Sequence, residues 1–171
     1  MERFNNTLKY SLYGAALSFV VLILLLVSGN SPWSSASWMG CWIPGVTAYF
    51  VLKLNAEENP EAAISFYQAF KQSMNVIFFQ ALFFTIISIL FTSIFDTGAL
   101  EMYRAEMVQN AEQLALLMGE EMYDQVINEL ENISYFTLAF WDFVYKLFGG
   151  AIVSLILAGI FKKNKPIFEN E

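Results

Sequence analysis

Apolar residues gather in four long segments of this chain instead of recurring evenly along it. Residues 10–27, 33–52 and 72–95 contain no charged side chain, and residues 143–161 contain only Lys146. A helix of about 20 apolar residues, rising 1.5 Å per residue, crosses the roughly 30 Å hydrocarbon core of a bilayer. The pattern therefore predicts an all-α, polytopic membrane protein with four transmembrane helices, at about residues 10–28, 33–52, 72–95 and 141–161.

A polar segment separates the third and fourth apolar segments and follows the period of a helix. Apolar residues recur there at intervals of three and four: Leu100, Tyr103, Met107, Ala111, Leu114 and Met118, and then Met122, Val126, Leu130 and Ile133. Gly119 lies between the two runs and predicts a helix end. Residues 97–132 are thus predicted to form an amphipathic helical hairpin. Its apolar stripes need to be covered by each other, by the bilayer surface or by a partner.

The composition supports a membrane protein. Of the 171 residues, 57% are hydrophobic and 15% are charged, whereas about a quarter of the residues in a soluble domain are charged. Four spans use about 80 residues. We therefore expect a single membrane domain over residues 1–171, with the lipid bilayer as its main surroundings.

Charge indicates how the spans are oriented. Lys and Arg close to span ends remain in the cytoplasm. Seven of the nine basic residues lie in the two tails and in the link between the second and third spans: Arg3, Lys9, Lys53, Lys71, Lys162, Lys163 and Lys165. Residues 96–142 carry ten acids and one base, Arg104. Both termini are therefore predicted to be cytoplasmic and the acidic hairpin extracytoplasmic.

The second apolar segment is interrupted by polar and helix-breaking residues. Pro44 removes a backbone donor and crowds the preceding turn, so we expect a kink there. The segment is either a kinked packing helix or a broken helix at a substrate site. After it, Pro60 suits the first turn of a helix that is expected to run on into the third span.

Small residues recur on one face of several predicted spans. Such residues allow helix backbones to approach closely, either within the chain or across a dimer face. The candidates for helix packing are Gly14, Ser18, Ser37, Cys41, Gly45, Gly150, Ser154 and Ala158.

A few polar residues lie within or beside the predicted spans. Asp142 and Lys146 are four residues apart, a spacing that permits an ion pair on one helix face. Asn75 and Gln80 lie in the third span. Ionisable groups at membrane depth are candidates for function; interfacial anchoring and hydrogen bonds between helices are the plainer interpretations.

The sequence has few of the residues that catalysis commonly uses. It has no His and one Cys, Cys41, so His-dependent triads and the commonest zinc ligand are missing. The acids of the hairpin have helical-surface spacing, which is typical of a solvated face. We expect no metal, no cofactor and no enzymatic activity, and an acidic chain gives no reason to expect nucleic-acid binding.

Three segments, which together extend over most of the chain, resemble a known family. Ile64-Ser65-Phe66-Tyr67-Gln68-Ala69-Phe70-Lys71 resembles the "ISF-x-QAFK" segment that opens the third span of the bacterial domain-of-unknown-function family numbered forty-one ninety-nine. Residues 149–163, which begin with Gly149-Gly150 and end with Lys162-Lys163, are similar to that family's last span. The acidic hairpin with Gly119-Glu120-Glu121 is similar to the family's central region. The resemblance implies a four-span inner-membrane protein without an assigned activity, and a link to envelope glycan assembly.

The sequence favours a non-enzymatic accessory or scaffold subunit, acting with a membrane protein partner or as a homo-oligomer. The alternative is a small oligomeric transporter or channel, based on the broken second span and the polar residues of the spans. A third hypothesis is a membrane enzyme, which requires two outer carboxylates to converge in one pocket.

Overall fold

The computed structural model describes residues 2–58, 60, 62–95 and 97–163. These residues form six α-helices and one 3-10 helix, without a strand in the described ranges. The elements are α1 (Glu2–Val27), η1 (Ser35–Gly40), α2 (Ile43–Glu58), α3 (Phe66–Ile94), α4 (Ala99–Met118), α5 (Glu120–Asn132) and α6 (Tyr135–Phe161). The all-α prediction is confirmed.

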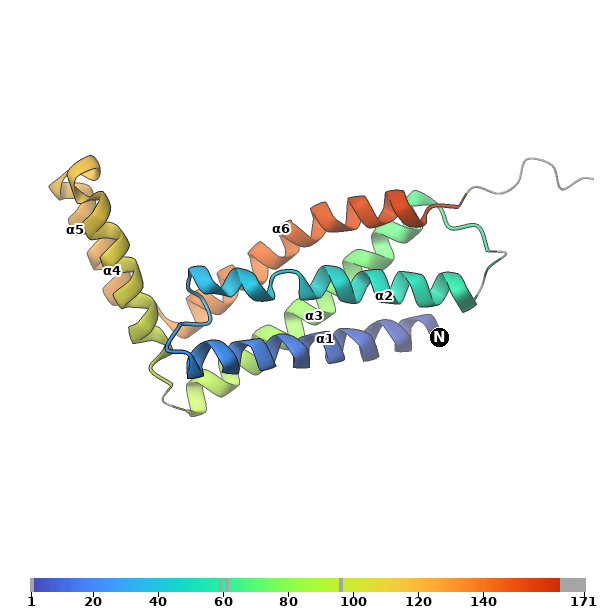
Figure 1. The fold of residues 1–171 in the computed structure, drawn as a ribbon, viewed down its shortest axis with the longest axis horizontal. Coiled ribbons are helices and arrows are strands. Elements are labelled where there is room, and N and C mark those ends of the chain that lie inside the picture. The colour runs from blue at the N-terminus through green and yellow to red at the C-terminus, as the bar shows by residue number, and fades with distance from the viewer. Residues whose placement is uncertain (1, 59, 61, 96, 164–171) are drawn as a thin grey trace, which may run out of the picture.

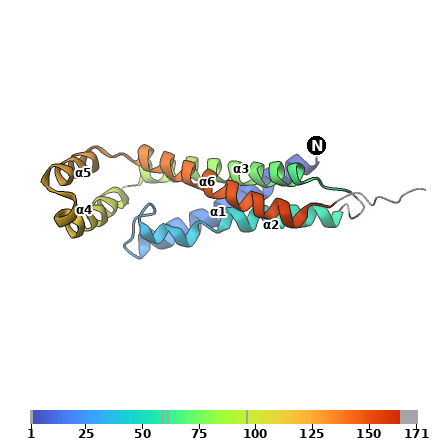
Figure 2. The same cartoon turned by 90° about the horizontal axis from the view of Figure 1, so that it is seen from above.

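Four helices form an elongated bundle, and the other two project from one end of it (Figures 1 and 2). In the bundle, α3 packs against α1, α2 and α6. The start of α1, the connection from α2 to α3 and the end of α6 all lie at the end opposite the projecting helices (Figure 1). Lys163 fastens two of these segments together, because its backbone N–H donates to Ile64 O at 2.9 Å and its Nζ donates to Pro60 O at 3.2 Å.

Among the described residues, three helices are long and apolar enough to cross a membrane: Asn5–Val27, Phe66–Ile94 and Tyr135–Phe161. They correspond to the predicted spans at 10–28, 72–95 and 141–161. The last two helices each begin six residues earlier than predicted. The charged residues Lys71 and Asp142 set the starts of the apolar segments in the sequence. The helices begin further back, where the side chains of Ser65 and Ser134 cap their first turns.

The second predicted span, 33–52, is not one continuous helix. It consists of η1, a turn at Cys41 and Trp42, and α2, whose 16 residues are too few for α2 to count as a span alone. Pro44 explains the position of the break: it has no N–H to donate to Gly40, and its ring crowds that carbonyl. In the first turn of a new helix beginning at Ile43, the missing donor costs nothing.

The start of α3 corrects the expectation at Pro60. Residues 62–65 are not helical, and Asn59 and Glu61 lie outside the described residues. The helix begins at Phe66 because Ser65 and Gln68 form a capping box: Ser65 Oγ accepts from Gln68 N–H at 3.2 Å, and Gln68 Oε1 accepts from Ser65 N–H at 2.9 Å.

The projecting helices α4 and α5 form the hairpin that the sequence pattern predicts. They pack against each other and meet at Gly119, whose φ of 79° suits glycine. Arg104 on α4 donates three hydrogen bonds of 2.9–3.1 Å to the carbonyls of Leu130, Glu131 and Ile133. A cation there satisfies the free carbonyls at the end of α5 and complements its dipole.

Candidate functional site

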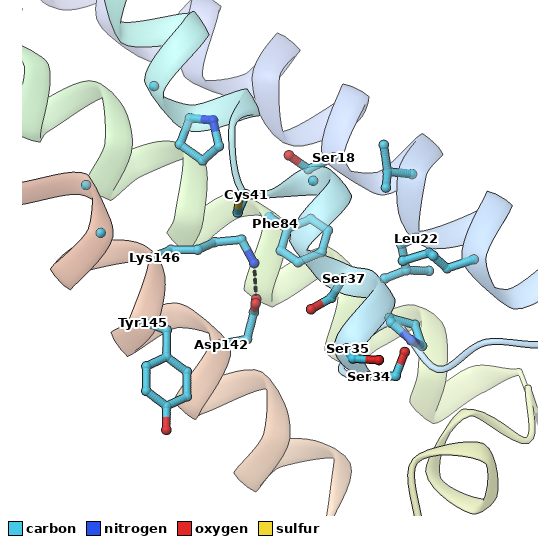
Figure 3. Close-up of a pocket in the computed structure, with 18 of the residues that line it drawn as sticks. Ser18, Leu22, Ser34, Ser35, Ser37, Cys41, Phe84, Asp142, Tyr145 and Lys146 are labelled. Atoms are coloured by element: carbon cyan, nitrogen blue, oxygen red, sulfur yellow. Dashed lines mark hydrogen bonds and ion pairs between the residues drawn. The ribbon is translucent and has the colours of Figure 1, made fainter. Parts of the chain in front are cut away.

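The break in the second apolar segment borders a cavity, which we call the outer cavity (Figure 3). Its volume is about 290 Å³, and it lies between α1, η1, α2 and α6, with Phe84 of α3 at its base. Its walls include Ser18 and Leu22 of α1, Ser34, Ser35, Ser37 and Cys41 around η1, and Asp142, Lys146 and Gly149 of α6. The cavity therefore exists because one helix of the bundle is interrupted.

Asp142 and Lys146 form an ion pair at the wall of this cavity (Figure 3). The two side chains are only 21% and 15% exposed. Lys146 Nζ also lies 4.4 Å from the centroid of the Phe84 ring, which is within cation–π range. Since an unpaired charge is costly to bury, the carboxylate and the ring together stabilise an ammonium group that projects into an otherwise apolar bundle.

Hydroxyl groups line the opposite wall but mostly bond to their own backbone. Ser34 Oγ donates to Ser31 O at 2.8 Å, and Ser18 Oγ donates to Gly14 O at 3.0 Å. Ser37 is half-buried, and the Cys41 thiol is free and exposed. The outer cavity thus combines one ion pair with several small polar groups, a donor and acceptor set suited to a small polar ligand.

Ser35 connects the outer cavity to the hairpin. Its backbone N–H and its Oγ donate to Glu106 Oε1 at 3.0 and 2.6 Å. The Glu106 carboxylate lies at the start of η1, where it satisfies a free N–H and complements the helix end. Sequence reasoning missed this contact, because the two residues are 71 positions apart and no local pattern joins them.

Gln80 lies at a junction of three helices below the outer cavity. It is 1% exposed, and its Nε2 donates to Ser18 Oγ at 3.4 Å. Its Oε1 has no hydrogen-bond partner among the described residues. A Cβ on Gly14 would lie 2.3 Å from that oxygen and 2.6 Å from Thr47 Oγ1. Glycine at position 14 therefore makes room for the Gln80 amide between α1 and α2.

Asn75 does not share a site with Gln80. It is exposed and borders a separate cavity of about 310 Å³ together with Thr7, Asn55 and Lys71, toward the opposite end of the bundle. The two polar residues of α3 therefore do not line one path through the bundle.

The structure places the remaining candidate packing residues between helices. A Cβ on Gly150 would lie 2.5 Å from Ile77, and one on Gly45 would lie 3.0 Å from Val153. Ser154 Oγ donates to Ser73 Oγ at 2.9 Å, and Ala158 is fully buried. These four positions therefore contribute to packing within the chain.

A smaller cavity of about 210 Å³ lies between the bundle and the hairpin. Trp33, Tyr103 and Trp141 line it, and it shares Asp142 and Tyr145 with the outer cavity. Burial raises the pKa of Tyr103, and the nearby Tyr145 and Glu106 raise it further. Tyr103 therefore keeps its proton and joins the apolar contact between α4 and the bundle.

Long apolar helices whose polar side chains turn inward define a helical membrane-associated protein. A family model described as "Protein of unknown function (DUF4199)" matches residues 9–163. The chain belongs to this family, which confirms the resemblance carried by residues 64–71 and 149–163. No curated protein and no solved structure matches the chain.

Proposed function

We propose that the chain is a four-span protein of the bacterial cytoplasmic membrane with both termini in the cytoplasm. Figure 1 shows η1 and α2 following α1 along the bundle. At 1.5 Å per residue in α2 and about 2 Å in η1, the two together reach about 36 Å, which exceeds the roughly 30 Å hydrocarbon core. The start of α1, the end of α2 and the end of α6 lie at the bundle end opposite the hairpin (Figure 1). Lys9 belongs to the first part of α1, Lys53 to the second half of α2 and Lys163 follows α6, which supports a cytoplasmic location for that end.

On this topology the chain is a non-enzymatic accessory or scaffold subunit whose hairpin holds a partner outside the membrane. The observation that carries this proposal is the way the acidic hairpin is built: it stands clear of the bundle and is held by Arg104 and by the contact between Glu106 and Ser35. Residues 97–133 contain eight acids and one base. Since the Arg104 guanidinium caps α5, the exposed charge of the hairpin is acidic and fits a partner with a basic surface.

Capture from native membranes tests the scaffold proposal. A photo-crosslinking residue at the exposed position Glu121, near the hairpin tip, should yield a specific adduct with one other protein. The combined variant Glu120→Gln, Glu121→Gln and Asp124→Asn should abolish capture in mild detergent, whereas a matched change on the lipid-facing side, Ile152→Val, should not. A lone chain under all conditions contradicts a scaffold. The implied family link makes glycan-assembly enzymes the first candidates to check among captured proteins.

Topology is tested separately. Because Cys41 is the sole cysteine, a Cys41→Ser chain that carries one new cysteine at Glu121 or at Lys162 reports which side each position faces. A membrane-impermeant thiol reagent should label the first in intact cells and the second only after lysis.

A small transporter or channel is the second candidate, and the outer cavity favours it. The cavity lies beside an interrupted helix and holds the Asp142–Lys146 ion pair, and interrupted helices form the substrate sites of many transporters. Flux into reconstituted vesicles that depends on Asp142, and is lost in Asp142→Asn, would support this candidate. Equal flux in vesicles with and without the protein, over a panel of small polar solutes, would argue against it.

A further inference from the structure

A second and larger hollow runs along the outside of the bundle between α1 and α2. We call it the α1–α2 groove; its volume is about 700 Å³. Tyr13 and Leu17 form the α1 side, Val46 and Phe50 form the α2 side, and Gly14 lies between them. The groove is separate from the outer cavity, since of all its lining residues none borders that cavity.

The walls of the groove are apolar and uncovered by the rest of the described chain. Tyr13, Leu17, Val46 and Phe50 are each more than half exposed. Gly14 lines the groove between these walls, and the side chains of Gln80 and Thr47 lie behind it. In a bilayer such a recess must be filled by hydrocarbon, since neither water nor backbone polar groups can occupy it favourably.

One end of the groove is polar. Lys53 and Glu57 line it and lie 3.8 Å apart as an ion pair, each about half exposed. Lys9 Nζ lies 5.9 Å from the ring centroids of both Tyr10 and Tyr13, which also line the groove. Lys53 and Glu57 thus line this end of the apolar recess, and the Lys9 ammonium lies beside two of the tyrosine rings that also line it.

The length of the groove matches one leaflet. From Lys53 back to Ile43, which follows Trp42 at the other end of the groove, α2 rises about 15 Å at 1.5 Å per residue. Half of the roughly 30 Å hydrocarbon core is about 15 Å. An acyl chain that starts at the Lys53 level therefore ends near Trp42, at the middle of the bilayer.

We propose that the α1–α2 groove is a specific site for a phospholipid whose headgroup carries both a phosphate and a primary ammonium, as phosphatidylethanolamine does. The phosphate is held by Lys9 and Lys53, the ammonium by Glu57, and an acyl chain fills the groove. A headgroup with a phosphate alone leaves Glu57 facing negative charge, and a choline headgroup offers the carboxylate no N–H donor. The site depends on α2 lying within the membrane, but not on a partner for the hairpin.

Native mass spectrometry of the full chain in mild detergent tests this proposal. The chain is incubated with phosphatidylethanolamine, phosphatidylglycerol or phosphatidylcholine that carry identical acyl chains. The wild-type chain should retain one phosphatidylethanolamine in preference to the other two. Lys53→Gln should weaken retention about fivefold, as expected for one cation beside a phosphate, whereas Lys162→Gln, which removes an exposed charge outside the groove, should have no effect.

Two further variants probe the groove and the headgroup separately. Val46→Trp fills the recess and should abolish retention, while Ile152→Trp adds the same ring to an exposed position of α6 outside the groove and should not. Glu57→Lys lies at the exposed rim and does not threaten folding; it should reverse the preference toward phosphatidylglycerol. Equal retention in Val46→Trp and Ile152→Trp, or an unchanged preference in Glu57→Lys, overturns the proposal. Labelling of the single-cysteine variants tests the proposed topology independently. It therefore distinguishes an α2 that lies outside the membrane from an α2 within the membrane that binds no lipid.

Discussion

Close packing of α6 against α3 depends on Gly150, and substitution there gives a quantitative test of the fold. A Cβ at position 150 would lie 2.5 Å from Cγ2 and 3.3 Å from Cδ1 of Ile77, which is fully buried. The neighbouring Gly149 has nothing within 4 Å of an added Cβ. Both glycines lie inside the same helix, so alanine at either position gains the same helix propensity, about 0.5–1 kcal/mol.

The two alanine variants should therefore differ in stability. Overpacking costs about 1–3 kcal/mol, and only Gly150→Ala incurs it. We expect the free energy of unfolding of Gly150→Ala to lie about 1–3 kcal/mol below that of Gly149→Ala. Reversible denaturation in mixed detergent micelles, followed by circular dichroism, measures both values.

A second substitution shows whether Ile77 is the cause. Ile77→Ala removes the clashing atoms and alone should cost about 2–5 kcal/mol. Combined with Gly150→Ala, it should cost about 1–3 kcal/mol less than the sum of the two single changes. Equal stabilities of the two alanine variants, or strict additivity with Ile77→Ala, would refute the close contact between these helices.

Three further predictions concern the outer end of the molecule. Arg104→Gln removes a charged donor from three carbonyls, and each charged hydrogen bond contributes about 1.5 kcal/mol or more to stability. Amide hydrogen exchange at the C-terminal end of α5 should therefore become at least about tenfold faster. Glu112→Gln, on the exposed face, should leave the exchange rate unchanged. Asp142→Asn leaves the Lys146 ammonium unpaired and should lower the free energy of unfolding by about 1–3 kcal/mol. Adding Lys146→Met should restore most of the lost stability. A double variant as unstable as Asp142→Asn alone would argue against the Asp142–Lys146 ion pair. The pKa of Tyr103 is higher in the folded chain than in the unfolded chain, so the free energy of unfolding should fall as the pH rises above about 10. Tyr103→Phe should make this fall less steep. An identical pH dependence in both chains would contradict burial of the phenol.

The helical elements could be predicted because their signals are local. Three of the four long apolar segments and the two periodic runs of the hairpin each correspond to one helix, and Gly119 lies where α4 ends and α5 begins. The break at Cys41 and Trp42 was less accessible. Pro44 predicts a kink or a break in the helix, but which of the two forms depends on the residues that pack around it. Here α6 takes the space beside Gly45 with Val153, a contact between residues more than 100 positions apart.

The candidate site was predictable only in its local part. Asp142 and Lys146 are one helical turn apart, so their pairing could be inferred from spacing alone. The contact of Lys146 with Phe84 could not, and neither could that of Ser35 with Glu106, because each depends on how separate helices dock. Gln80 was identified as a polar residue of a span, but the glycine that receives its amide lies on another helix.

The contact between Glu106 and Ser35 has a mechanical consequence. The Glu106 carboxylate accepts two hydrogen bonds from Ser35 in the first turn of η1, and η1 forms one wall of the outer cavity. A tilt of the hairpin therefore moves that wall. A partner that tilts the hairpin should change the width of the outer cavity, and by reciprocity a molecule bound in the outer cavity should restrain the hairpin. The contact between Glu106 and Ser35 thus links the position of the hairpin to the shape of the outer cavity.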